Sequence, residues 1–347
     1  MFESLSTPVL LVLFANAALV VTLVSIRVTA LADTIADRTR LGEALVGGLV
    51  LGAATSLAGV VVSVNAALSG DASYAFSNGI GGIAAQTLFL AFADMIHRKA
   101  NLEHAAAEPA SLFQCALLLF LLSLPLLAAS GPDVSIWSVH PVSLFMLVAY
   151  LWGMKLAYEV RENPQWRPVH TSDTRTDTPE DEDEPNRSAT GPMLQFAALV
   201  AVLGLAGYVI AQSGGAFIAR FGLSSSLVGA LVTAVATSLP ELVTTLAAVR
   251  RGALQLAVGG IVGGNTFDTL FLVLSDVSYR DGSLFHAIGG QDFFWLATGL
   301  AMTAVLLCGL ILRERRGPGR IGLESLLLIA IYAAALATEI TATAPSR

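Results

Sequence analysis

Two neighbouring stretches of the chain carry oxygen-bearing side chains at helical spacing within apolar sequence. In the first, ATSLPELVTT (residues 236–245), Thr237 and Glu241 are four positions apart, on one face of a helix, with Ser238 beside them. Pro240 removes a backbone N–H and displaces a carbonyl one turn earlier, which predicts a break in that helix. Hydroxyl, carbonyl and carboxylate oxygens are the ligands that hard cations prefer, so this face could bind Ca²⁺ or Na⁺.

The second stretch, AVGGIVGGNTFDTLF (residues 257–271), adds an amide and another carboxylate. Asn265 and Asp268 are three apart and share a helix face, and the surrounding glycines allow another helix to approach closely. Carboxylates at membrane depth are costly and suggest function by default. The alternative is a buried pair satisfied by Ser and Thr hydroxyls. We favour a cation site with Glu241 and Asp268 as carboxylate ligands, because two adjacent carboxylates repel without a cation or proton between them.

The elements that must position these residues are membrane helices. The 347 residues are 55% hydrophobic and only 13% charged, with a mean hydropathy of +0.71, whereas soluble domains have about 25% charged residues. Runs of about 20 apolar residues can cross a bilayer. Ten such runs occur, at about 8–27, 43–68, 74–96, 111–130, 139–160, 192–213, 225–249, 254–278, 292–313 and 322–341. This pattern predicts an all-α, polytopic protein with ten transmembrane helices, whose partners are the lipid bilayer and inorganic cations, without nucleic acid.

The distribution of basic residues predicts the orientation. If the N-terminus lies outside and ten helices alternate, sixteen of the 19 Lys and Arg residues fall on the inner side, as the positive-inside rule requires. We therefore expect a multi-pass protein of the cell membrane with both termini outside. The acidic, polar segment 161–190 is then a solvated cytoplasmic linker. The opening MFESLSTP is acidic, so the first run is interpreted as a mature helix rather than a signal peptide.

The two halves of the chain, 1–160 and 191–347, resemble each other. A shift of 182 residues aligns them without a gap over roughly sixty positions, and Thr55-Ser56-Leu57 meets Thr237-Ser238-Leu239. Because each half has five predicted helices, an odd number, the second half enters the membrane from the opposite side. This predicts two inverted five-helix repeats, the architecture of secondary transporters, whose sites lie where the repeats meet.

The segment TAVATSLPELVTTLAAVRRGALQLAVGGIVGGNTFD resembles the second α-repeat of the calcium/cation antiporter superfamily, which includes the sodium/calcium exchangers. The α-repeats of that superfamily read close to G-T-S-L-P-E and then G-N-x-x-G-S-N-x-x-N/D. The resemblance implies α-repeats at about 43–96 and 225–278, and cation exchange by alternating access. It implies transported Ca²⁺, Na⁺ or H⁺ and no cofactor. The ion ligands that it implies are Thr237, Ser238, Glu241 and Asp268, with Asn265 nearby.

The first repeat departs from this pattern. Ala58 and Gly59 replace the proline and the glutamate, Ile83 stands opposite Asn265, and Gln86 stands opposite Asp268. The neutral oxygen donors that remain for the site are Thr55, Ser56, Asn78 and Gln86. With two carboxylates from one half only, the site would hold two negative charges. That count predicts electroneutral exchange of one divalent cation for two monovalent cations or two protons.

Two other functions remain open at this stage. An intramembrane hydrolase could use Glu241 and Asp268 as an acid–base pair, although no His or Cys falls near them within the predicted helices. Alternatively, the altered first repeat could mark a non-transporting partner or sensor. The surroundings of Gly59 distinguish these cases: a polar space there favours transport, and a dry contact favours the non-transporting protein.

Asp94 and Asp276 also recur at the 182-residue shift, each followed by Arg at four and His at ten positions, the latter being His104 and His286. A gate or a proton relay is one interpretation. The favoured one is a cluster at the membrane boundary that makes local ion pairs, because charges at helix ends are ordinary.

Overall fold

A computed structural model describes residues 2–39, 55–97, 99–174, 190–317 and 321–343. Within these ranges, nine helical segments are long and apolar enough to cross a membrane. They are α1 (Thr7–Thr39), α5 (Ala72–His97), α7 (Pro109–Ser130), α8 (Pro141–Glu162), α9 (Thr190–Phe221), the continuous α10 (Ser225–Leu227), η3 (Val228–Thr233) and α11 (Ala234–Arg251), then α12 (Leu254–Ser278), α14 (Gly290–Leu312) and α15 (Leu323–Thr343). For the described residues, the predicted all-helical class with several membrane-length helices is confirmed.

The remaining predicted span, at about 43–68, is described only in its second part. There α4 (Leu57–Leu68) forms a 12-residue apolar helix, and residues 43–54 lie outside the described residues. The other described elements are short: η1 (Phe2–Ser4), α6 (Leu102–Ala105) and α13 (Leu284–Ala287). The number of ten transmembrane helices therefore stays a prediction.

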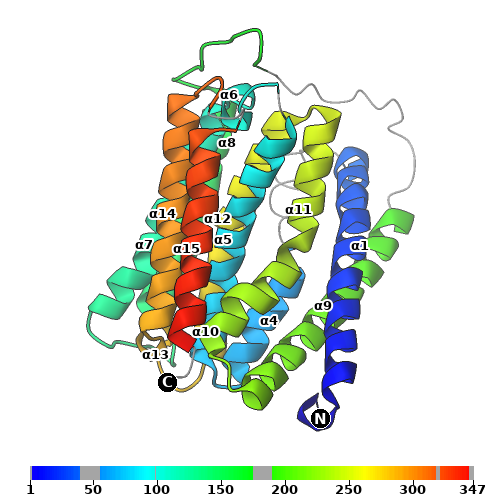
Figure 1. Ribbon diagram of the computed structural model, residues 1–347, viewed down its shortest axis with the longest axis vertical. Coiled ribbons are helices and arrows are strands. Elements are labelled where there is room, and N and C mark those ends of the chain that lie inside the picture. The colour runs from blue at the N-terminus through cyan, green and yellow to red at the C-terminus, as the bar shows by residue number, and fades with distance from the viewer. Residues whose placement is uncertain (1, 40–54, 98, 175–189, 318–320, 344–347) are drawn as a thin grey trace.

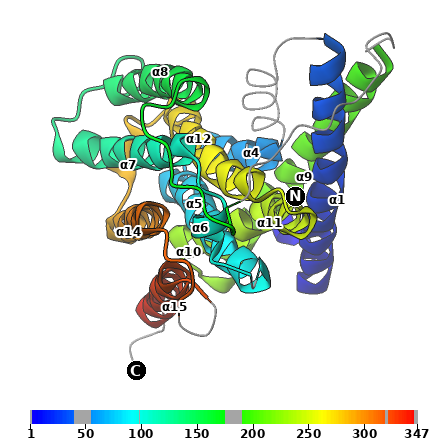
Figure 2. The same ribbon diagram turned by 90° about the horizontal axis from the view of Figure 1, so that it is seen from above.

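The helices α5 and α12 form the interior of the bundle (Figures 1 and 2). Their membrane windows are 78% and 67% buried, the highest values among the described spans. Figure 2 shows α1 and α9 at one side of them and α7, α8, α14 and α15 at the other. Small residues allow the tight packing: a Cβ on Gly229 of η3 would lie 2.8 Å from the Tyr74 carbonyl oxygen of α5.

The helix break predicted at Pro240 is wrong, because α11 continues through that residue. The irregular backbone lies earlier, where η3 forms a π-helical turn. Threonine hydroxyls bond to carbonyls on either side of the proline. Thr237 donates to Thr233 O at 3.0 Å, and Thr244 donates to Pro240 O at 3.0 Å. Serine and threonine hydroxyls near a proline are common in membrane helices that continue through it.

The two ends of the bundle differ in what they carry (Figure 1). We call the end with α6 and residues 163–174 the linker face, and the end with α13 and the N-terminal helix start the termini face. Asp94 at the linker face accepts the amides of Leu102 at 2.7 Å and Gly322 at 2.8 Å.

At the termini face Asp276 accepts the amides of Leu284 at 2.9 Å and His140 at 2.8 Å. These bonds repeat those of Asp94 at the 182-residue shift. The two aspartates therefore hold backbone amides in place. The local ion pairs predicted for this cluster stay a prediction, because Arg98 lies outside the described residues. The histidine contacts recur as well: His104 bonds to Arg313 O at 2.8 Å, and His286 bonds to Gly131 O, 182 positions earlier, at 3.3 Å. His286 also lies 3.6 Å from Asp133.

Candidate functional site

A small cavity lies between α4, α5, α11 and α12, where the two halves of the chain meet. Its volume is about 10 Å³, which is room for one water-sized particle. The residues that line it are Ser56, Gly59, Asn78, Gly82, Gln86, Thr237, Ser238, Glu241, Asp268 and Phe271. Seven of the nine residues predicted as ion ligands are in this set, and Thr55 and Asn265 lie outside it.

Asp268 is held by side chains of the other half of the chain. Ser56 donates a hydrogen bond to its Oδ1 at 2.8 Å, and Gln86 donates through Nε2 to its Oδ2 at 2.7 Å. Only 1% of the Asp268 surface is exposed. Hydrogen bonds to a charged acceptor are among the stronger ones in proteins, so these two contacts fix the carboxylate in the cavity wall.

Glu241 has a buried oxygen without a partner. Its Oε2 makes no hydrogen bond within the described part of the chain, while Thr55 lies in hydrogen-bonding contact with the carboxylate. The Oε1 of Gln86 is equally buried and unpartnered. Buried polar atoms that lack a partner carry a desolvation penalty, which a cation or a proton in the cavity would relieve.

The hydroxyls of Thr237 and Ser238 complete the polar wall. Thr237 directs its proton to backbone carbonyls of α11 and η3, at 3.0 and 3.2 Å, which leaves a lone pair for the cavity. Ser238 accepts a longer hydrogen bond from Gln86 Nε2 at 3.3 Å. Thus both hydroxyls can present oxygen to a bound ion.

The two asparagines differ in their relation to the cavity. Asn78 lines the cavity, but its amide donates to Gly59 O at 3.1 Å and Ser63 Oγ at 2.9 Å. Its Oδ1 accepts a hydrogen bond from Thr233 at 2.8 Å. The Asn78 side chain therefore links α5, to which it belongs, with α4 and η3. Asn265 faces away from the cavity lining and donates to Thr87 Oγ1 at 2.9 Å.

Two lining residues, Gly82 and Phe271, were missed by the sequence analysis, and Phe271 is the one with a side chain. A Cβ on Gly59 would lie 2.6 Å from Cε2 of the Phe271 ring and 3.6 Å from Thr237 Oγ1. The ring therefore fills the volume that a side chain at position 59 would need. Gly59 borders the polar cavity, which favours transport, and it also lies against the Phe271 ring, which favours a non-transporting protein. The surroundings of Gly59 therefore do not decide between the two functions. The available signal was spacing: Phe271 follows Asp268 by three residues and shares its helix face.

This arrangement suits binding of a hard cation or protons. Two carboxylates, hydroxyls and an amide oxygen surround a cavity of about 10 Å³, and such all-oxygen ligand sets are typical of Ca²⁺ sites. None of the described lining residues is a His or Cys.

Comparison with known proteins gives the family. The family model described as "Sodium/calcium exchanger protein" matches residues 9–155 and 191–341, which is most of the chain. The chain is 33% identical to CaxA of Alkalimonas amylolytica over 102 residues, 29% of this chain and 31% of that protein. The match thus spans about a third of the length of this curated relative.

Two solved structures share the fold. The sodium-calcium exchanger NCX_Mj superposes with a TM-score of 0.61 at 16% identity, covering 95% of this chain and 98% of that one. The H⁺/Ca²⁺ exchanger CAX superposes with a TM-score of 0.66 at 15% identity, covering 97% of this chain and 87% of that one. With the family model matching both halves, the chain belongs to the sodium/calcium exchanger protein family, a family of membrane transporters.

Proposed function

We propose that the protein is a secondary active cation antiporter that exchanges Ca²⁺, or another cation, for Na⁺ or H⁺ by alternating access. The observation that carries this proposal is the pair of carboxylates, half-buried Glu241 and buried Asp268, on one cavity of about 10 Å³ between the two halves. The ligands proposed are Thr237, Ser238, Glu241, Asp268, Ser56 and Gln86, with Thr55, Asn78 and Asn265 as supporting residues. The names of the structural neighbours, a sodium-calcium and an H⁺/Ca²⁺ exchanger, support the choice of ions.

The charge of the site explains why exchange would be obligatory. Fully ionised, Glu241 and Asp268 give the empty site two negative charges, and Gly59 adds none. Moving uncompensated charge through a low-dielectric passage is strongly unfavourable, so the empty carrier stays in place. One divalent ion, two monovalent ions or two protons neutralise it and permit reorientation. The cycle is therefore electroneutral.

The architecture proposed for this cycle is ten transmembrane helices in two inverted five-helix repeats. The repeats are residues 1–160 and 191–347, joined by the linker 161–190. The distribution of basic residues supports a cytoplasmic linker face and outer termini in a cell membrane. The recurrence of the Asp94 and Asp276 hydrogen bonds at opposite ends of the bundle supports the inversion.

Ion flux tests the function directly. The purified protein is reconstituted in sealed vesicles, and Ca²⁺, Na⁺, K⁺ and pH gradients are varied one at a time. We expect Ca²⁺ movement that requires an opposing Na⁺ or H⁺ gradient and carries no current. Absence of flux under every gradient, with the protein folded, would reject the antiporter.

A second candidate is a non-transporting member of the family that acts as a partner or sensor. The contact between Gly59 and Phe271 favours it, because an aromatic ring fills one side of the cavity where the other half presents Glu241. Such a protein would bind a cation without moving it. Cation binding to the purified protein, measured without flux in the same vesicles, would distinguish this candidate from the antiporter.

A further inference from the structure

Glu103 in α6 is a buried acid that no donor satisfies. Its side chain is 0% exposed, and within the described residues neither carboxylate oxygen has a hydrogen-bond partner. The carboxyl group of Glu324, at the start of α15, faces it. Glu324 is 4% exposed and its Oε1 is also unpartnered. Two ionised carboxylates are both acceptors, so they can hydrogen-bond only when a proton lies between them.

The opposite end of the bundle shows that this junction does not require an acid pair. The residues 182 positions from Glu103 and Glu324 are Phe285 and Val142. Phe285 is 0% exposed and packs edge-on against His140 with ring centroids 5.8 Å apart, and Val142 joins the same hydrophobic cluster.

The backbone around the two junctions is held alike by the aspartates described above, Asp94 and Asp276. An apolar pair is therefore sufficient for the local fold. Burying two acids in its place is costly unless they bind something.

Two carboxyl groups act on Glu103, those of Asp94 and Glu324. Asp94, at the end of α5, already accepts two backbone amides. In α6 itself, His104 bonds to Arg313 O and Thr171 Oγ1. Glu324 also lies beside two glycines, Gly309 of α14 and Gly322.

Basic groups of the loop after α14 are directed elsewhere. Arg313 donates to Val169 O and Thr174 Oγ1 of the linker and to His104 O. Arg315 pairs with Asp173. Burial, with Asp94 and Glu324 nearby, raises the pKa of Glu103 well above its usual range. Arg98 and Arg320 lie outside the described residues.

We propose that Glu103 and Glu324 form a proton-binding site at the linker face, separate from the transport cavity. The pair holds one shared proton in the closed junction. When that proton leaves, three neighbouring carboxylates, those of Asp94, Glu103 and Glu324, carry like charge in a dry setting and repel one another. The junction between α6 and α15 then loosens.

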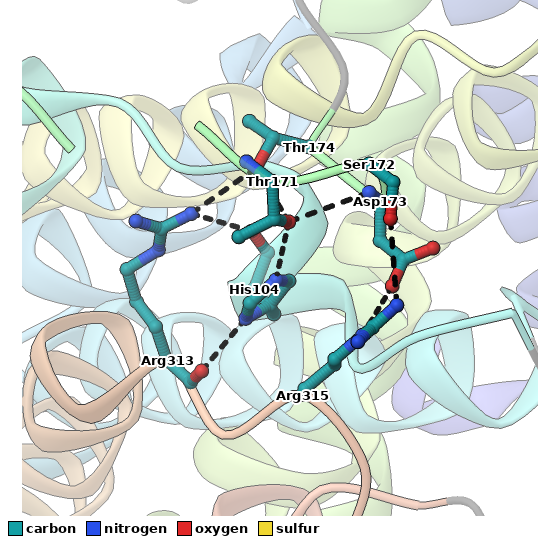
Figure 3. Close-up of polar contacts among 7 residues, drawn as sticks. All are labelled: His104, Thr171, Ser172, Asp173, Thr174, Arg313 and Arg315. Carbon is teal, nitrogen blue, oxygen red and sulfur yellow. Dashed lines mark hydrogen bonds and ion pairs between the residues drawn. The ribbon is translucent and has the colours of Figure 1, made fainter. Parts of the chain in front are cut away.

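The linker is attached to this junction, so it responds to the same proton. Figure 3 shows His104, the residue after Glu103, between the Arg313 backbone and Thr171, with the Arg313 guanidinium directed at Thr174. Arg315 and Asp173 close the other side. A displacement of α6 breaks the His104 contacts to both the linker and the loop after α14. Loss of the proton therefore releases residues 169–174.

Hydrogen exchange tests this inference without any transport measurement. Because the pKa of Glu103 is raised, the stability that the bound proton contributes is complete below the ordinary glutamate pKa. This contribution is lost as pH rises through the raised pKa. As pH rises from the ordinary glutamate range, about 4.3, into the alkaline range, we expect the protection factors of residues 102–106 and 169–174 to fall at least tenfold, after correction for intrinsic exchange. Protection of α13, the counterpart with Phe285, should change far less.

Matched variants isolate the pair. Glu103→Phe with Glu324→Val installs the residues of the opposite end and should make protection of α6 independent of pH. Glu103→Gln with Glu324→Gln serves the same purpose if the first variant fails to fold. Exposed Glu162 provides the control, and Glu162→Gln should behave as wild type.

Several results would overturn the inference. Protection that stays constant with pH in the wild type would do so, and so would pH-dependent protection that persists in both double variants. If added Ca²⁺ restored protection at alkaline pH, a metal ion would take the place of the proton.

Discussion

The two helix pairs that surround the cavity, α4 with α5 and α11 with α12, have different tasks despite their related sequences. The pair α11 and α12 supplies both carboxylates, Glu241 and Asp268. The pair α4 and α5 supplies no charge, and instead Ser56 and Gln86 orient Asp268 by hydrogen bonds. Two helix pairs of related sequence can therefore divide charge and positioning between them.

The largest effect should come from removing the unsatisfied charge of α11. We expect Glu241→Gln to abolish exchange, because the site then has one negative charge and cannot neutralise a divalent ion. The fold should remain, since the substitution removes a carboxylate whose buried Oε2 lacks a partner and keeps the side-chain shape. Vesicle flux and melting temperature in detergent measure the two expectations.

A matched control separates the site from general effects of a lost glutamate. Glu162→Gln, on the exposed end of α8, should transport and melt like the wild type. Stabilisation by Ca²⁺ should disappear in Glu241→Gln, because only a bound ligand raises the melting temperature. Normal flux in Glu241→Gln would remove this residue from the mechanism and give the charged task to Asp268 alone.

A smaller effect is expected at Asp268, because its partners belong to the other half. In Asp268→Asn the amide still offers an oxygen, and Ser56 and Gln86 can turn to bond it. We expect exchange to weaken by about tenfold or more, the factor that corresponds to about 1.4 kcal/mol, with altered preference between divalent and monovalent ions. Competition of Na⁺ and K⁺ against Ca²⁺ uptake gives the measurement. Unchanged ion preference would count against direct contact of Asp268 with the ion.

Particular residues show how far the sequence alone predicts this site. The site residues of the second half could be predicted because carboxylates are rare in apolar helices and indicate function. Seven of the predicted residues line the cavity. Asn265 was misplaced, since spacing gives the face of a helix but does not identify the neighbour, here Thr87.

Phe271 was missed for a related reason. A phenylalanine in a membrane helix is ordinary, and its role depends on the empty position at Gly59 across a helix interface. The helix was also expected to break at Pro240, whereas local hydroxyl bonds from Thr237 and Thr244 accompany an unbroken α11. The packing of Phe271 against Gly59 joins residues far apart in the chain, so local sequence pattern does not predict it.

A carboxylate can be added to the first half by substitution at Gly59, and we expect an effect on transport of intermediate size. The sequence suggests that Gly59→Glu alone adds a third charge, but a side chain there meets the Phe271 ring, so we expect that variant to fold poorly. Gly59→Glu with Phe271→Ala removes the obstacle and should move one additional positive charge per cycle. Current under saturating, clamped ion gradients measures it. Phe271→Ala alone should transport without current, and a current in the wild type would disprove the electroneutral cycle.

The smallest effect concerns the positioning hydrogen bonds. Ser56 donates to Asp268 at 2.8 Å, whereas Ser238 takes part in a longer bond to Gln86 at 3.3 Å. A hydrogen bond to a charged group contributes about 1.5–3 kcal/mol and one between neutral groups about 1 kcal/mol. We therefore expect Ser56→Ala to lower the stability of the ion-free protein more than Ser238→Ala does.

A bound ion should reduce the loss of stability caused by Ser56→Ala. In the ion-free protein, Ser56→Ala leaves Asp268 Oδ1 without a donor in a buried wall. A bound Ca²⁺ compensates that oxygen directly, so the difference in melting temperature between Ser56→Ala and the wild type should narrow in saturating Ca²⁺. A difference that is equal with and without Ca²⁺ would mean that Ser56 acts by packing alone. Within the first half, the orientation of Asp268 would then rest on Gln86 alone.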